Sequence, residues 1–243
     1  MRVQDSVVGR RSVRAFLDQP VPIEIIERVL TAARSAPSNA NFQPQYVDVL
    51  AGEALTEFTT AMGERFHADT TPDPCQYEIF PAHGPWPQRR FTLGAKVYGA
   101  WGVERGDTGG RRRFLEKNLR FFDAPVGLIL SIDREGGPYQ WADMGIYLQT
   151  LMLLLREEGL DSCAQANWAE YAATVSELLG WPANRDLYCG ISVGYADPAH
   201  PVNAFPRDRE ELSSYVRFHG VPAQTGQLTE NTKTENTTKE LHR

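Results

Sequence analysis

The sequence Pro125-Val126-Gly127-Leu128-Ile129-Leu130-Ser131-Ile132 is a short, continuous apolar run near the middle of the chain. Such a run with β-branched residues is typical of a strand that is buried on both faces. It is followed by the strongest helical pattern of the chain, residues 141–158, which Gly159 ends. The pair predicts a sheet covered by helices.

Outward from this strand, the alternating Tyr46-Val47-Asp48-Val49-Leu50 predicts a second strand, and Leu187–Tyr195 predicts a third, buried one. A helix is expected to start at Pro22, because its apolar residues recur on one helical face up to Ala33. Further helices are expected over residues 54–66, 89–101, 111–122 and 169–179. Strands so far apart in sequence, separated by helices, indicate an α+β fold.

One domain is expected over residues 1–220. Within it, residues 66–90 are rich in proline and aromatic residues, which predicts an irregular excursion without regular helix up to Gln88. From Gln224 onward the apolar residues almost vanish, so residues 221–243 are expected to form a disordered tail.

Bulk composition excludes several classes of protein. The net charge of -6 over 243 residues argues against a nucleic-acid binder. The cysteines Cys75, Cys163 and Cys189 lack the spacing of a disulfide framework or of a zinc site, so no metal is expected. No signal peptide precedes Arg10, and no segment is apolar enough to span a bilayer. We therefore expect a cytoplasmic protein without membrane contact.

Residues suited to bind a ligand are concentrated in three segments. Arg10-Arg11-Ser12-Val13-Arg14 near one end and Arg207-Asp208-Arg209 near the other supply guanidiniums and a hydroxyl, which together suit a phosphate. Between them, Ala36-Pro37-Ser38-Asn39-Ala40-Asn41-Phe42-Gln43-Pro44 offers amides that suit the polar edge of a planar ring. A phosphate-bearing ligand is indicated. The alternative is that the first arginines lie solvated on a short N-terminal helix and that the amides only form turns.

Two apparent motifs are rejected. Gly190-Ile191-Ser192-Val193-Gly194 matches the hydrolase nucleophile pattern, but no helix can start promptly after it, so it is expected to be a closely packed strand. Cys163 follows Leu160 in an apolar context without a second cysteine nearby, which indicates a structural thiol. Glycine-rich nucleotide fingerprints are absent from the sequence.

Several ordered segments resemble the FMN-dependent nitroreductase family. They span about residues 5–220 and comprise Arg10–Phe16, Ala36–Pro44, Asn118–Val126, Asp143–Gly145, Gly159–Gln165, Cys189-Gly190 and Gly194–Pro198. The long excursion between Ala51 and Lys117 is similar to the branch that includes nitrobenzoate reductase. The resemblance implies a central mixed sheet flanked by helices in an intertwined homodimer, with two FMN sites at the interface.

The resemblance also implies a role for each site residue. The FMN phosphate would be held by Arg10, Ser12, Arg207 and Arg209, with Arg11 contributing mainly through its backbone, and Arg14 would lie near the pyrimidine edge of the flavin. Pro37, Ser38, Asn39 and Asn41 would come from the partner subunit, Asn118 and Asp143 would contact the ring or the ribityl chain, and the backbone of Ala164, Gln165 and Ala166 would run beside flavin N5.

The activity that the resemblance implies is a ping-pong transfer of hydride from NAD(P)H through FMN to a nitroaromatic or other flat acceptor. No side chain is expected to act as an obligatory acid or base, because the flavin carries the chemistry. Two alternatives stay open: a flavin-dependent dehydrogenase or oxidase of a biosynthetic pathway, and a non-catalytic flavin-binding protein.

Overall fold

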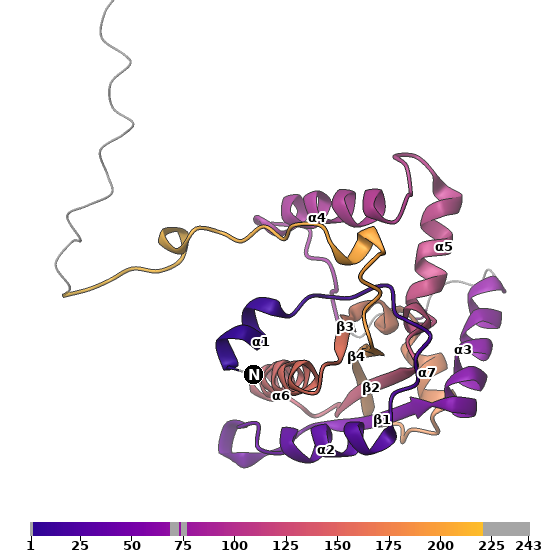
Figure 1. Cartoon of the computed structure of the whole chain (residues 1–243). Helices are drawn as coiled ribbons and strands as arrows, with labels where there is room; N and C mark the ends of the chain where they lie inside the picture. Colours follow the sequence, from indigo (N-terminus) through magenta and orange to yellow (C-terminus); the bar gives the residue numbers. More distant parts are fainter. Residues whose placement is uncertain (1, 69–72, 74–76, 221–243) are drawn as a thin grey trace, which may run out of the picture. The chain divides into compact units, whose positions relative to one another are not determined.

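The computed structural model describes residues 2–68, 73 and 77–220. The chain divides into two units, Met1–Pro206 and Arg207–Arg243. The predicted tail, residues 221–243, and Cys75 lie outside the described residues. The first unit holds the sheet and the helices around it (Figure 1).

The helices of the first unit are α1 (Val3–Gly9), α2 (Ile23–Ala33), α3 (Gly52–His67), α4 (Trp86–Ala100), α5 (Thr108–Asn118), α6 (Pro138–Glu157) and α7 (Ala172–Leu178). Its strands are β1 (Tyr46–Ala51), β2 (Val126–Asp133), β3 (Asp161–Gln165) and β4 (Arg185–Gly194). Short 3₁₀ segments are η1 (Asn39–Asn41), η2 (Phe121–Asp123), η3 (Ala166–Tyr171) and η4 (Pro201–Asn203). These elements confirm the predicted α+β class.

The strands form a sheet in the order β1-β2-β4-β3, with antiparallel pairing between each neighbouring pair. An isolated parallel bridge joins Ser12 to Ser162 at the β3 edge. We expected a mixed sheet. Among the described residues, the strands pair antiparallel, and the parallel component is this bridge. The C-terminal end of the segment carrying the arginines is held by an antiparallel bridge between Phe16 and Ala196.

Both faces of the sheet are buried, as the apolar run of β2 predicts. Alternate residues of β2 face two different cores, because successive side chains of a strand point to opposite sides. Leu128 and Leu130 pack with apolar residues of α2 and α6, whereas Ile129 packs with residues of α3, α7 and η3. Figure 1 shows these helices on either side of the sheet.

Close packing explains the glycines and the serine of the rejected hydrolase motif. A Cβ atom on Gly190 would lie 2.3 Å from the indole ring of Trp168, so only glycine fits there. Ser192 is fully buried within β4, and its hydroxyl donates to the carbonyl of Cys163 over 3.4 Å. The interpretation of this segment as a packed strand is confirmed.

Several predicted boundaries were wrong. Helix α4 begins at Trp86, inside the proline-rich excursion, because Pro87 occupies the first turn, where the missing N–H costs nothing. Helix α6 begins at Pro138 for the same reason. Helix α5 ends at Asn118, after which the backbone of Phe121 and Phe122 turns to positive φ. Strand β3 was not predicted.

The second unit contributes one described 3₁₀ turn, η5 (Leu212–Ser214). The N–H of Ser214 donates to the carbonyl of Glu211 over 2.9 Å, which closes this turn. Its large apolar side chains Leu212, Tyr215 and Phe218 are exposed within the chain.

Candidate functional site

The arginine-bearing segment, residues 10–17, is extended and lies along the sheet. Helix α1 ends at Gly9, so the arginines do not lie on a short N-terminal helix, as the alternative assumed. The N–H of Val13 donates to the carbonyl of Ser162 over 3.1 Å, and the N–H of Leu17 donates to the carbonyl of Tyr195 over 2.9 Å. These bonds fix the segment against β3 and the residues that follow β4.

Alternation along this segment gathers the predicted phosphate contacts on one side. Val13 and Ala15 are buried, and side chains of an extended chain point to opposite faces in turn. Arg10, Ser12 and Arg14 are therefore on the other face, and each is partly exposed. Two guanidiniums and a hydroxyl thus share one face, as an anion site requires.

Arg14, Ser12 and Arg10 also act on the thiol of Cys163 in β3. Burial raises the pKa of the Cys163 thiol, whereas Arg14, a hydrogen bond with Ser12 and, more weakly, Arg10 lower it. Because burial dominates, the thiol stays protonated at neutral pH. The expectation of a structural cysteine agrees with this burial.

Asn203, which sequence reasoning missed, ties the segment to the end of the first unit. Its Oδ1 accepts from the N–H of Arg14 over 2.9 Å, and its Nδ2 donates to the carbonyls of Ala15 and Asp197 over 2.8 and 2.9 Å. The guanidinium of Arg11 donates to the carbonyls of Asn203 and Phe205 over 3.4 and 3.3 Å. The Arg11 side chain is thus engaged within the chain, which suits the expectation that Arg11 serves a ligand through its backbone.

Asn118 and Gln165, both predicted site residues, contact each other. The Nε2 of Gln165 donates to the backbone carbonyl of Asn118 over 2.6 Å and to its Oδ1 over 2.9 Å. Gln165 is buried, and its Oε1 has no hydrogen-bond partner among the described residues. A buried acceptor without a partner is costly, so it marks a place where a ligand donor fits.

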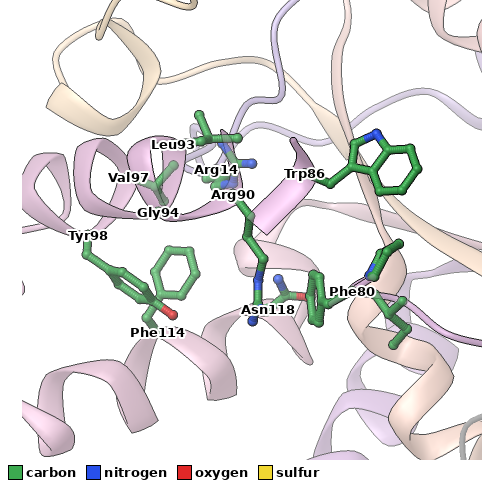
Figure 2. A pocket seen from close by; sticks show the side chains of 12 residues that line it. Arg14, Phe80, Trp86, Arg90, Leu93, Gly94, Val97, Tyr98, Phe114 and Asn118 are labelled. Carbon is green, nitrogen blue, oxygen red and sulfur yellow. The ribbon is translucent and has the colours of Figure 1, made fainter. Parts of the chain in front are cut away.

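A pocket of about 510 Å³ opens beside these groups. Arg14 and Asn118 line it together with apolar and aromatic side chains of residues 79–98 and with Phe114 (Figure 2). Tyr98 and Phe114 meet edge to face, with their ring centroids 5.1 Å apart. The lining contains two arginines, Arg14 and Arg90, and no carboxylate. A flat, electron-poor or anionic ligand suits such a pocket.

The loop of residues 36–43 is built differently. Ala40, Asn41 and Gln43 have φ values of 47°, 59° and 49°, and Asn39 and Asn41 are exposed. The hydroxyl of Ser38 accepts from the N–H of Gln43 over 3.0 Å. The loop therefore presents the side chains of Asn39 and Asn41 outside the core of this chain, and their contact with a partner subunit stays a prediction.

Asp143 of α6 is placed under this loop. Its Oδ1 accepts from the N–H of Asn39 over 3.0 Å, while its buried Oδ2 has no partner among the described residues. One carboxylate oxygen thus positions the loop. A contact between Asp143 and a cofactor stays a prediction.

The remaining predicted residues fall in three places. Ala164 is in β3, next to Gln165, and Ala166 begins η3 and is exposed. Pro37 is exposed in the loop. Arg207 and Arg209 belong to the second unit, so their sharing of a ligand with Arg10 and Ser12 stays a prediction.

Comparison with known proteins identifies the family. Residues 7–195 match the sequence profile of the nitroreductase family. The chain belongs to this family. Among curated nitroreductase relatives, it is 36% identical to a 4-nitrobenzoate reductase of Pseudomonas putida, over 88% of this chain and 94% of the relative. It is 37% identical to a nitrobenzene nitroreductase of Ectopseudomonas oleovorans, over 89% and 96% of the two chains.

Solved nitroreductase structures agree with this assignment. The FMN and NADPH-dependent nitroreductase NfnB of a Sphingopyxis strain superposes with a TM-score of 0.87 at 39% identity, over 91% of this chain and 100% of the other. NfnB of Mycobacterium smegmatis, solved in complex with NADPH, gives a TM-score of 0.82 at 37% identity, over 89% and 97% of the two chains.

The part of this nitroreductase that the structure describes lacks both a metal-binding cluster and a membrane-spanning helix. No group of three or more His, Cys, Asp or Glu side chains could hold a metal ion there. No helix there has both the length and the apolar content to cross a membrane.

Proposed function

We propose that this chain binds FMN and uses NAD(P)H to reduce a nitroaromatic compound. The observation that carries the proposal is the shared face of Arg10, Ser12 and Arg14 beside β3, next to the pocket that Arg14 and Asn118 line. The relatives named above support the cofactor, the reductant and the class of acceptor.

The residues of the site fit FMN. Guanidiniums and a hydroxyl suit its phosphate, and the buried, unpaired Oε1 of Gln165 and Oγ of Ser162 are places for polar contacts. Arg10 and Ser12 would hold the phosphate, with Arg207 and Arg209. Asn118, Gln165 and the backbone of residues 164–166 would border the ring. When bound, FMN supplies two-electron chemistry, taking hydride from NAD(P)H and giving it to the nitro group in a second half-reaction at the same site.

The chain itself contributes charge, orientation and an apolar wall. Arg14 places a cation at the pocket, which favours the negative charge that reduction adds to the ring. The aromatic side chains of the pocket hold a flat acceptor by stacking. The described lining of the pocket contains no histidine and no carboxylate, and the absence of an obligatory acid or base stays a prediction.

A homodimer completes the proposal. The loop of residues 36–43 is exposed and conformationally strained within one chain, yet it carries Ser38, Asn39 and Asn41. In the proposed dimer these residues reach the FMN of the partner subunit. The cytoplasmic location stays a prediction.

Binding of FMN is tested through the arginines. Arg10→Ala should weaken FMN binding by at least tenfold, the loss of about one charge-assisted contact, while the melting temperature changes little. Arg209→Ala should do the same. Arg113→Ala removes an equal charge from an arginine of α5 whose side chain is 73% exposed, and it should leave FMN binding unchanged. Normal FMN affinity in both site variants would show that they were misassigned.

Catalysis is tested by anaerobic mixing. The purified yellow protein should be bleached by NADH or NADPH, and the reduced protein should then be reoxidised by a nitro compound. A flavin that neither nicotinamide reduces would favour the dehydrogenase or oxidase alternative. A protein that cannot be loaded with FMN at all would exclude both the nitroreductase and the flavin-dependent dehydrogenase or oxidase. Bound flavin that no substrate oxidises or reduces would favour a binding protein.

A further inference from the structure

We propose that Arg90, stacked on Phe80, is a specificity group that selects acceptors carrying a carboxylate on the aromatic ring. This inference deepens the proposed function and rests on it. The names of the relatives leave the charge of the acceptor open, since some refer to nitrobenzoate and others to nitrobenzene or chloronitrobenzene. The pocket of this chain decides between them.

The charge of the pocket lining is positive. Arg90 from α4 and Arg14 are its charged side chains, and the rest of the lining is apolar, aromatic or amide. Arg90 makes no ion pair with a carboxylate of any described residue. Arg14 belongs to the proposed cofactor contacts. Arg90 is therefore the cation of this pocket that remains for the acceptor.

The stacking on Phe80 prepares Arg90 to bind a carboxylate. Its guanidinium carbon lies 3.6 Å from the centroid of the Phe80 ring, and Figure 2 shows the side chain extending from α4 to this ring. Stacking uses the flat face of the guanidinium, whereas its N–H donors point outward in the plane. The cation is thus held in place while its donors stay available for two parallel hydrogen bonds to a carboxylate.

The size of the site favours a compact ligand. Arg90, Phe80, Tyr98 and Phe114 line the same pocket of about 510 Å³, so a flat ligand among the aromatic side chains shares this pocket with the guanidinium. An aromatic carboxylate is such a ligand. The reductant also carries anions, namely its pyrophosphate and, in NADPH, a 2′-phosphate, but neither group is part of the nicotinamide ring, and the 2′-phosphate is at the far end of the dinucleotide from it.

The test compares an acid with its neutral ester. We would measure kcat/KM for 4-nitrobenzoate and for methyl 4-nitrobenzoate, which keeps the ring and an electron-withdrawing substituent, in the holoenzyme and in Arg90→Gln. In Arg90→Gln, kcat/KM should fall about tenfold for the acid and change by less than about threefold for the ester. The reason is that only the acid loses a charge-assisted hydrogen bond, in a partly exposed site. Arg90→Lys keeps the charge but lacks the planar, two-pronged guanidinium. Its kcat/KM for the acid should lie between the values of the natural protein and of Arg90→Gln. Arg113→Gln is the matched surface control and should leave kcat/KM unchanged for both the acid and the ester.

A binding measurement covers the case in which turnover is slow. Benzoate should bind the holoenzyme in calorimetry about tenfold more weakly in Arg90→Gln, with benzamide unaffected. Two results would overturn the inference: equal losses for the acid and the ester, and a KM for NADPH that rises in Arg90→Gln while that for NADH does not. If no nitro compound is reduced but benzoate binding depends on Arg90, the anion site stands and the proposed function fails.

Discussion

The segment of residues 10–17 and the loop of residues 36–43 both carry residues predicted to bind the cofactor, but the chain holds them in opposite ways. The segment is bonded to β3 and to Tyr195 along its backbone, and its apolar side chains are buried. The loop is exposed, has three residues of positive φ and is tied to the core through Asp143. The segment is therefore held along its length by its own chain, whereas the loop leaves Asn39 and Asn41 exposed for the partner contact that we propose.

The two regions also differ in what supports their backbone. The segment takes its order from β3, whose own hydrogen bonds to β4 are already satisfied, so the site is built on a rigid element. The loop keeps a positive φ at Ala40, which is strained for an alanine. Such strain persists where a functional surface needs it.

The largest effect is expected from loosening the segment. Asn203→Ala removes the acceptor for Arg14 and the donors to Ala15 and Asp197, and three lost hydrogen bonds of about 1 kcal/mol each should lower the free energy of unfolding by about 3 kcal/mol. Denaturant unfolding measures the loss. Asn203→Asp keeps the Oδ1 acceptor but turns a second carboxylate oxygen toward the carbonyls of Ala15 and Asp197, so it should not restore the lost stability. Equal stability of Asn203→Ala and the natural protein would contradict the picture of a firmly held segment.

A smaller effect is expected at the anchor of the loop. Asp143→Ala leaves the N–H of Asn39 without its acceptor, so exchange of this amide with solvent should accelerate about tenfold, which corresponds to one hydrogen bond of about 1.4 kcal/mol. Hydrogen exchange followed by NMR or mass spectrometry gives the rate. Asp143→Asn retains an oxygen acceptor and serves as the control. Unchanged exchange in Asp143→Ala would show that the loop is held by something else.

The smallest effect should be a gain in stability. Ala40 has a φ of 47°, which costs a non-glycine residue about 1 kcal/mol, so Ala40→Gly should raise the free energy of unfolding by up to about 1 kcal/mol. Ala95→Gly, at an exposed position inside α4, should lower it by about 1 kcal/mol. Calorimetric melting of both variants makes the comparison. A loss of stability in Ala40→Gly would mean that the loop is not strained in solution.

Local patterns predicted the elements whose burial repeats regularly. The apolar spacing of α2 places Ile26, Val29 and Ala33 in the core, and the apolar run of β2 is buried on both faces, as predicted. Strand β3 was missed because its residues Asp161-Ser162-Cys163-Ala164-Gln165 carry no apolar periodicity. Its conformation comes from pairing with β4, which is a distant contact.

The site residues also divide into those that local sequence motifs predict and those that depend on distant contacts. Arg10, Ser12, Arg14, Asn118 and Gln165 could be named from ordered motifs, and the structure brings them to β3 and its pocket. Asn203 and Arg90 could not be named. An isolated asparagine or arginine has no spacing that marks it, and its role depends on which backbone or ring lies opposite.

The amino-acid sequence alone determined the class of the fold and the family, and it supplied most of the residues that we propose for the cofactor, because local periodicity and ordered short motifs carry these signals. Tertiary structure alone decided which of these residues share a face, which are tied down and which stay exposed. The physical reason is that hydrogen bonds such as those of Asn203, and stacking such as that of Arg90 on Phe80, join groups whose separation along the chain is unrelated to their distance in space.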